Sequence, residues 1–176
     1  MLEDIVLAPE LRAPAPALSQ PPSRQPMLRI KPDHLPAHLA DHEMREFTAT
    51  EAAERWKELR PLLGKVPPFA NGEYEAGDLL SMVRKGHANL LCLMKGDEIR
   101  LAMVYQEQTL PRKKVFFMLS VGGRDAQDFA NHFLRPLKEE VKKRGVDSVR
   151  CAVRPAIVRF CKRFAPVTSL YTLLEI

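Results

Sequence analysis

The clearest pattern of apolar and polar positions lies in the middle of the chain. Residues 115–121 form a nearly continuous apolar run that ends at Gly122 and Gly123. Such a run predicts a strand that is buried on both faces. Over residues 126–141 the apolar side chains recur three and four positions apart, which predicts one stripe of a helix, and Gly145 ends it. We therefore expect a strand, a glycine turn and a long helix as the central unit.

Shorter patterns on both sides of this unit predict the remaining elements. We expect helices at residues 48–63 and 75–85, strands at 88–95 and 98–106, and, after the long helix, a strand at 147–153, a helix at 155–164 and a strand at 167–176. The order is α-α-β-β-β-α-β-α-β. It predicts the α/β (α+β) class, with a mixed central sheet flanked by helices.

The first part of the chain has a different composition. Eight of the 15 prolines lie before residue 37, and each one removes a backbone donor and restricts φ. We therefore predict two parts, an extended proline-rich arm at residues 1–47 and a folded domain at 48–176. The arm carries scattered apolar residues such as Ile5 and Leu11. A segment of this kind gains order by binding, so we expect residues 1–47 to contact a protein partner or other copies of the chain.

The positive charge belongs to the predicted domain. The net charge is +5, made of −2 up to Thr48 and +7 after it. A basic domain is compatible with nucleic-acid binding, and the candidate basic face comprises Arg150, Arg154, Arg159, Lys162 and Arg163. Charges of both signs alternate along the chain, however, which is the usual pattern of a solvated surface. Nucleic-acid binding is therefore the least favoured of three functional hypotheses.

The cysteines and the N-terminus bear on the compartment. Cys92, Cys151 and Cys161 have no CxxC spacing and fit reduced core thiols of an intracellular protein. The N-terminus is acidic and its apolar run is short, so we expect neither secretion nor a membrane anchor.

Three histidines form a candidate metal site. His34, His38 and His42 are four positions apart, and on a helix they would share one face. Pro36 interrupts this stretch, which favours solvent-exposed histidines over a metal site.

The order of elements over residues 48–176 resembles the GNAT (Gcn5-related N-acetyltransferase) fold. In that family the loop before the long helix reads Gln/Arg-x-x-Gly-x-Gly/Ala, and its amides bind the pyrophosphate of acetyl-CoA. The resemblance implies that Val121, Gly122, Gly123 and Arg124 would contact acetyl-CoA if this cofactor is bound. The motif is incomplete in both registers. Arg124 stands at the second glycine position when Gly122 takes the first, and Asp125 stands there when Gly123 takes the first.

The resemblance also implies catalytic candidates. GNAT enzymes often use a strand glutamate as general base, and Glu107 is the candidate here. A later family signature contains a tyrosine that protonates the departing thiolate. When the segment RPAIVRFCKRFAP is aligned on Arg154, Cys161 stands at that tyrosine. Packing is the usual role of such a cysteine, and exposure that of such a glutamate.

Two acidic residues decide between the functional hypotheses. Asp125 and Asp128 fall in the first turn of the long helix, where we expect Asp125 to cap the amides and both to repel a pyrophosphate. The first hypothesis is therefore a catalytically degenerate GNAT-fold structural or binding protein with no cofactor. The alternative is an active acetyl-CoA-dependent N-acetyltransferase with a divergent cofactor loop.

The C-terminal part adds a location to the first hypothesis. The segment that begins at Arg154 also resembles a phage-encoded GNAT-like group of proteins encoded near virion genes. This second resemblance implies a component of a virion or of the host cytoplasm, whose N-terminal arm clamps onto neighbouring subunits.

Overall fold

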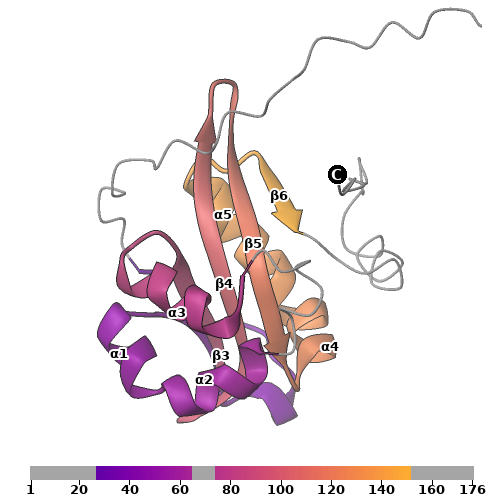
Figure 1. Cartoon of the computed structure of the whole chain (residues 1–176). Helices are drawn as coiled ribbons and strands as arrows, with labels where there is room; N and C mark the ends of the chain where they lie inside the picture. The colour runs from indigo at the N-terminus through magenta and orange to yellow at the C-terminus, as the bar shows by residue number, and fades with distance from the viewer. Residues whose placement is uncertain (1–26, 65–73, 152–176) are drawn as a thin grey trace, which may run out of the picture.

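The computed structural model describes residues 27–64 and 74–151, and these residues build one six-stranded sheet (Figure 1). The strands are β1 (Arg29–Ile30), β2 (His42–Phe47), β3 (Asn89–Lys95), β4 (Glu98–Leu110), β5 (Lys113–Gly123) and β6 (Ser148–Cys151). They lie side by side in chain order. All neighbours are antiparallel except β5 and β6, which are parallel. The parallel pair requires a crossover, and the long helix supplies it.

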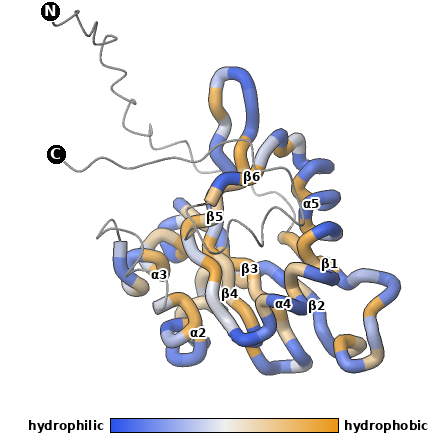
Figure 2. The backbone as a smooth tube through the Cα atoms, turned by 90° about the vertical axis from the view of Figure 1, so that its right-hand side faces the viewer, coloured by the Kyte–Doolittle hydropathy of each residue, from blue (hydrophilic) through white to orange (hydrophobic). Residues whose placement is uncertain are grey.

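Helices cover both faces of the sheet. On one face lie α1 (Ala49–Glu54), α2 (Trp56–Leu63) and α3 (Ala76–Arg84). On the other face the chain is helical from Ala126 to Lys143, as α4 (Ala126–Asp128), a π-helical segment (Phe129–Phe133) and α5 (Leu134–Lys143). The side view in Figure 2 shows the sheet between these two layers. The predicted class, a mixed sheet flanked by helices, is confirmed.

Each helical layer packs on its own hydrophobic core. The core under the long helix includes Met103, Phe116 and Phe133, and the core under α1, α2 and α3 includes Leu59 and Val104. Alternate residues of β4 contribute to opposite cores, because successive side chains of a strand point to opposite faces. β3 and the first half of β4 are therefore buried on both sides. The run at residues 115–121 is buried only in part, since Val115 and Phe116 are buried whereas Val121 is 38% exposed.

The segment 28–47 contributes β1 and β2 to the sheet, so the predicted arm at residues 1–47 extends too far along the chain. Leu28 is 1% exposed and Met44 is 0% exposed, and β2 pairs with β3 along its whole length. The sequence obscures β2 because two of its inward positions, His42 and Glu46, are polar. His42 faces Asp125, and Glu46 accepts a hydrogen bond from the Leu28 amide at 2.8 Å.

The helix predicted at residues 48–63 forms in two pieces that meet at Arg55. It begins as the sequence indicates, because the Thr48 hydroxyl accepts from the Glu51 amide at 3.1 Å, and the Glu51 carboxylate accepts from the Thr48 amide at 2.8 Å. This capping box satisfies two amides that would otherwise lack partners. The helix predicted at 75–85 forms as α3.

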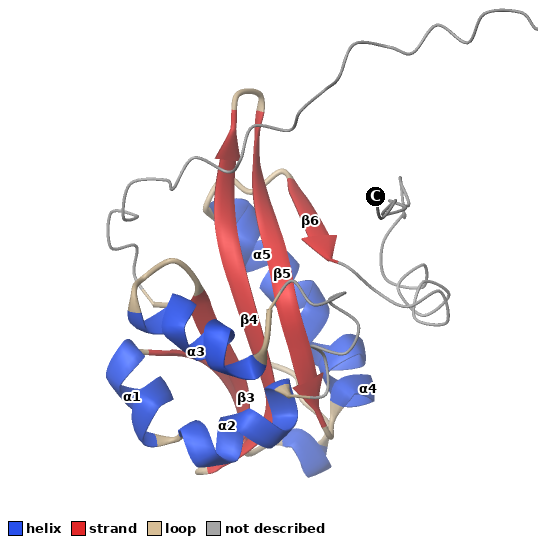
Figure 3. Ribbon diagram, viewed as in Figure 1, coloured by secondary structure: helices blue, strands red, loops and turns tan. Residues whose placement is uncertain are grey.

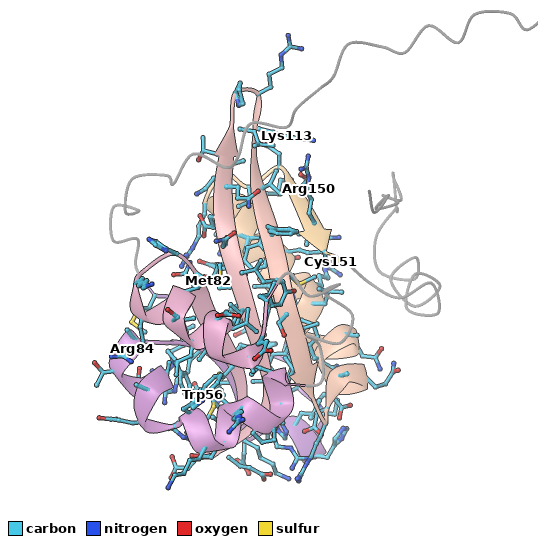
Figure 4. All side chains as sticks on the ribbon, viewed as in Figure 1. Trp56, Met82, Arg84, Lys113, Arg150 and Cys151 are labelled. Atoms are coloured by element: carbon cyan, nitrogen blue, oxygen red, sulfur yellow. The ribbon has the colours of Figure 1, made fainter. Side chains whose placement is uncertain are left out.

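The β4–β5 hairpin is longer than predicted and projects beyond the other strands (Figure 3). Its tip lies between Leu110 and Lys113, and Figure 4 shows Lys113 near this end. The register shifts by one residue between Val104 and Tyr105, which leaves Leu119 as an extra residue on β5. Such a bulge bends a strand and frees one of its peptide groups from the ladder.

The C-terminal elements are described only in part. Arg150 and Cys151 lie on β6 (Figure 4), and the predicted helix at 155–164 and strand at 167–176 lie outside the described residues. Cys92 is buried with a free thiol, and Cys151 is half-buried. In the described part of the chain, no helix has the length and apolar character needed to cross a membrane.

Candidate functional site

The predicted cofactor loop forms the end of β5 and the start of the long helix. Val121, Gly122 and Gly123 still pair with β4, opposite Met103, Ala102 and Leu101. The Arg124 amide then donates to the Arg100 carbonyl at 2.9 Å. The strand therefore continues two residues further than the apolar run indicated, and both glycines belong to it.

Close packing explains the two glycines. A Cβ atom on Gly122 would lie 2.1 Å from the Leu62 carbonyl oxygen of α2. One on Gly123 would lie 2.5 Å from the Leu101 Cα atom of β4. Contacts this short do not occur for real Cβ atoms, so only glycine lets the end of β5 lie against both neighbours. The glycine pair thus positions the loop by contacts inside the protein.

Asp125 does not cap the helix, which corrects the sequence-based prediction. Its carboxylate accepts two hydrogen bonds from Arg100, at 2.7 Å from Nε and 2.8 Å from a terminal nitrogen. His42 Nε2 lies 3.6 Å from the same carboxylate and is almost fully buried. No side-chain hydrogen bond caps the helix start within the described residues. The prediction failed because the capping rule considers only nearby sequence, whereas Arg100 comes from another strand.

The Arg100 pair also sets the charge state of Asp125. The two charge-assisted hydrogen bonds hold the pKa of Asp125 below its ordinary value of 3.8, with a further contribution from His42. Asp125 is therefore ionised at neutral pH, and its charge is balanced by the guanidinium. Asp128 also points elsewhere, since its carboxylate lies 3.8 Å from His38 Nε2.

The start of the long helix consequently keeps an anion-binding character. The first amides of an α-helix have no intrahelical acceptors, and here they are those of Ala126, Gln127 and Asp128. With the Asp125 carboxylate turned to Arg100, no side chain of the described residues caps them, and such amides can bind an anion. The side chain of the preceding residue, Arg124, is 72% exposed, and its guanidinium lies 3.8 Å from Glu98 Oε1. This arrangement suits the diphosphate of coenzyme A, although the Arg124 amide is already bound to β4.

A second feature lies further back along β5, at the bulge. The Tyr74 hydroxyl, just before α3, donates a hydrogen bond to the Leu119 carbonyl. Leu119 is the extra residue of the bulge, and its carbonyl accepts this bond from a side chain. The contact fixes the segment before α3 on the sheet.

Glu107, the candidate general base, is held by two cations. Its carboxylate lies 2.5 Å from Lys114 Nζ and 3.4 Å from an Arg144 terminal nitrogen, and its side chain is 13% exposed. It lies within β4, opposite Phe116, and not at the exposed strand end that the sequence suggested. In this geometry Glu107 ties the hairpin to the end of the long helix. A base role would require it to leave both partners.

The chain is similar to known proteins in its fold and not in its sequence. By sequence, the chain matches no family model and none of the curated proteins. By structure, it is similar to a ribosomal-protein-alanine N-acetyltransferase from Brucella melitensis biovar Abortus 2308, with a TM-score of 0.56 at 9% identity over 77% of this chain and 99% of the other. The chain has the fold of the GNAT acetyltransferases.

Two further GNAT-fold structures show the same likeness. A GNAT family acetyltransferase from Staphylococcus aureus has a TM-score of 0.55 at 14% identity, over 77% of this chain and 98% of the other. An aminoglycoside acetyltransferase from an uncultured soil metagenomic sample, solved with sisomicin, has a TM-score of 0.51 at 8% identity, over 77% and 97%. These structures are of acetyltransferases and carry no support for the predicted virion role.

The remaining predicted sites are dispersed or lie outside the described residues of this GNAT fold. His38 is in a 3-10 helix (Ala37–Leu39) and His42 is in β2, so the helix that would align them with His34 does not form. The described residues contain no group of three side chains suited to a metal. Cys161 and the basic residues from Arg154 onward lie outside the described residues, and only Arg150 of that face is placed, on β6.

Sequence reasoning missed Arg100, His42 and Tyr74. Arg100 alternates with apolar neighbours in β4 and is indistinguishable from a solvent-facing residue. For His42 the sequence indicated a metal ligand or, in preference, a solvent-exposed side chain, whereas the side chain is buried beside Asp125. Their link to Asp125 depends on the register that pairs Leu101 with Gly123, which no local pattern predicts.

Proposed function

We propose that the chain is an acetyl-CoA-dependent N-acetyltransferase with a divergent cofactor loop. The observation that carries this proposal is the orientation of Asp125, whose carboxylate binds Arg100 and leaves the amides at the start of the long helix open. The GNAT fold and the acetyltransferase activity named for similar structures support it. The hypothesis of a catalytically degenerate protein rested mainly on the expectation that Asp125 occupies these amides. The orientation of Asp125 removes that reason.

Each part of the loop has a proposed role in binding. The first-turn amides of the long helix would donate to the diphosphate, and the helix dipole adds to the attraction. The exposed guanidinium of Arg124 would balance a second negative charge. When bound, acetyl-CoA supplies the acetyl group as a reactive thioester. The glycines keep the strand end close to α2 and β4, so that the amides are presented at a fixed place.

The direct test is calorimetry with coenzyme A. We expect a one-to-one isotherm with micromolar affinity and a higher unfolding temperature in the presence of the ligand. Pantetheine, which lacks the diphosphate, serves as the matched ligand and should bind at least about tenfold more weakly, because the proposed contacts go to the diphosphate. A chain that shows no heat and no thermal shift with either ligand would contradict the proposal.

The other two hypotheses remain predictions. A structural role would make assembly depend on residues 1–26, so a chain that begins at residue 27 would lose an oligomer that the full chain forms. Nucleic-acid binding would appear as an affinity that falls steeply with salt. Size-exclusion chromatography with light scattering, and DNA titrations at low and high salt, distinguish them from the enzyme.

A further inference from the structure

Arg100 contacts three consecutive residues of the cofactor loop. Its carbonyl oxygen accepts from the Arg124 amide at 2.9 Å and lies beside Gly123, where a Cβ atom would approach it to 2.4 Å. Its guanidinium binds the Asp125 carboxylate through two nitrogens. One residue of β4 therefore sets both the backbone path of the loop and the direction of its acidic side chain.

The guanidinium is itself held in place. Glu98 Oε1 accepts a hydrogen bond from a terminal nitrogen of Arg100 at 2.8 Å, so the guanidinium group cannot rotate freely. On the other side of Asp125, His42 Nε2 lies 3.6 Å from Oδ2, the oxygen that also binds Arg100 Nε. The Asp125 side chain is 15% exposed and the His42 side chain 3% exposed. Asp125 is thus enclosed by groups from β2 and β4.

A capping conformation of Asp125 would close the site, and it requires ψ of Asp125 to turn from 41° towards the extended region. Asp125 occupies the N-cap position of the long helix, where an aspartate side chain ordinarily accepts from the amides two or three residues further on. A carboxylate in that place would occupy the amides that a diphosphate needs and would repel its charge. The bidentate pair with Arg100 is the stronger of the two alternatives, because both of its bonds are charge-assisted.

We propose that Arg100 is a positioning residue of the cofactor site, which keeps the Asp125 carboxylate away from the first-turn amides and so leaves them open for the diphosphate of coenzyme A. This inference rests on the proposed function. Arg100 acts through Asp125 and does not itself touch the ligand. Loss of Arg100 therefore weakens binding only while residue 125 carries a carboxylate.

The test uses coenzyme A as the probe in calorimetry with the full chain. Four proteins are compared with the wild type: Arg100→Gln, Asp125→Asn, the double variant, and Arg29→Gln. Arg29 is a matched control, since it is a strand arginine paired with a carboxylate, Glu43, at 2.9 Å, and it lies on the edge strand β1. Circular dichroism and thermal unfolding confirm that each variant is folded.

We expect Arg100→Gln to bind coenzyme A about tenfold more weakly, because the released carboxylate competes for the amides. Asp125→Asn should bind at least as tightly as the wild type, and the double variant should return to within about threefold of Asp125→Asn. Arg29→Gln should bind as the wild type does. The recovery in the double variant is the decisive result, since a merely structural role of Arg100 would lower affinity in both backgrounds.

Each other outcome overturns a stated claim. A wild-type chain that does not bind coenzyme A contradicts the proposed function and this inference together. A wild type that binds while Arg100→Gln binds equally well contradicts the inference alone, as does a double variant no tighter than Arg100→Gln. If Arg100→Gln does not fold, Arg100→Lys replaces it, because lysine keeps the positive charge but cannot form the bidentate pair. We then expect the affinity for coenzyme A to fall about threefold and to recover when Asp125→Asn is added.

Discussion

At the scale of single residues, the site depends on pairs that are distant in sequence. Arg100 and Asp125 are 25 positions apart, yet they form the shared hydrogen bonds that direct the loop. Gly122 and Leu62 are brought together in the same way by the packing of α2 on the end of β5. Such pairs decide which polar groups stay open to a ligand. They also give the sharpest mutational tests.

The ion pair between Asp125 and Arg100 should make the free energy of unfolding depend on pH. Because the folded-state pKa of Asp125 lies below its ordinary value of 3.8, the pair stabilises the protein above about pH 4, and this contribution is lost as the pH falls through the lowered pKa. We expect Asp125→Asn to unfold about 1–3 kcal/mol more easily at pH 7. The difference from the wild type should shrink steadily below about pH 4.

Urea unfolding of both proteins between pH 7 and pH 3 measures this difference. Within the described residues, the charged groups that pair with Asp125 are Arg100 and His42, and neither residue is substituted in the variant. A difference that stays constant down to pH 3 would refute the assignment.

Gly122→Ala should be strongly destabilising. The new methyl group would meet the Leu62 carbonyl at 2.1 Å, so α2 or the end of β5 must move. We expect a loss of about 2–3 kcal/mol. Gly77→Ala is the matched control, because no atom lies within 4 Å of its Cβ position in α3. The control should be unchanged or up to about 0.5 kcal/mol more stable, and equal effects at the two sites in urea unfolding would be inconsistent with the packing.

At the scale of elements, charged groups join the projecting hairpin to the long helix. Glu107 of β4 binds Lys114 of β5 and Arg144 at the end of α5. Lys114 Nζ also donates to the Arg144 carbonyl at 3.2 Å. Burial strengthens these contacts and makes their loss costly. The hairpin and the helix should therefore unfold together.

Glu107→Gln tests this link. The variant removes the carboxylate charge between two largely buried cations, and we expect a loss of stability of about 1–3 kcal/mol. Glu139→Gln, on the exposed face of α5 and paired with Arg135, should change stability by less than about 0.5 kcal/mol. Thermal and urea unfolding of the two variants give the comparison. Glu107→Gln that is as stable as Glu139→Gln would show that the ion pairs contribute little.

At the scale of the whole molecule, the sheet includes strands that composition assigned to an arm. β2 pairs with β3 over six residue pairs, from His42 with Lys95 to Phe47 with Leu90. β1 adds a short edge strand, whose Ile30 is 6% exposed. Removing these strands would expose the buried side of β3. We therefore expect the smallest folded unit to begin before residue 28.

Truncation provides the test. A chain that begins at residue 46 loses β1 and most of β2, and we expect it to be insoluble or unfolded, because the long helix then lacks part of its core. A chain that begins at residue 27 keeps every described strand and is the comparison. Circular dichroism and the cooperativity of thermal unfolding distinguish the two. If the shorter chain unfolds in a cooperative transition, the folded domain begins near residue 48, as the sequence predicted.

Local patterns were sufficient for those elements whose apolar side chains repeat regularly. The strands at residues 88–95 and 115–121, the helix at 75–85 and the long helix follow this rule, since the core of a sheet selects the same periodicity that makes each element stable. Their order was enough to indicate the GNAT fold. β2 was missed because His42 and Glu46 occupy inward positions, and their partners are remote.

The sequence by itself thus determined the class of the fold and the place of the loop between β5 and the long helix. Only the tertiary structure decided the direction of the Asp125 carboxylate. Local rules favour a helix cap at that position, but the register of β4 against β5 brings Arg100 beside it, and a bidentate charged pair outweighs a cap. The pairing of β4 with β5 therefore decides whether the Asp125 carboxylate covers the first amides of the helix, and no residue near Asp125 in the sequence indicates that pairing.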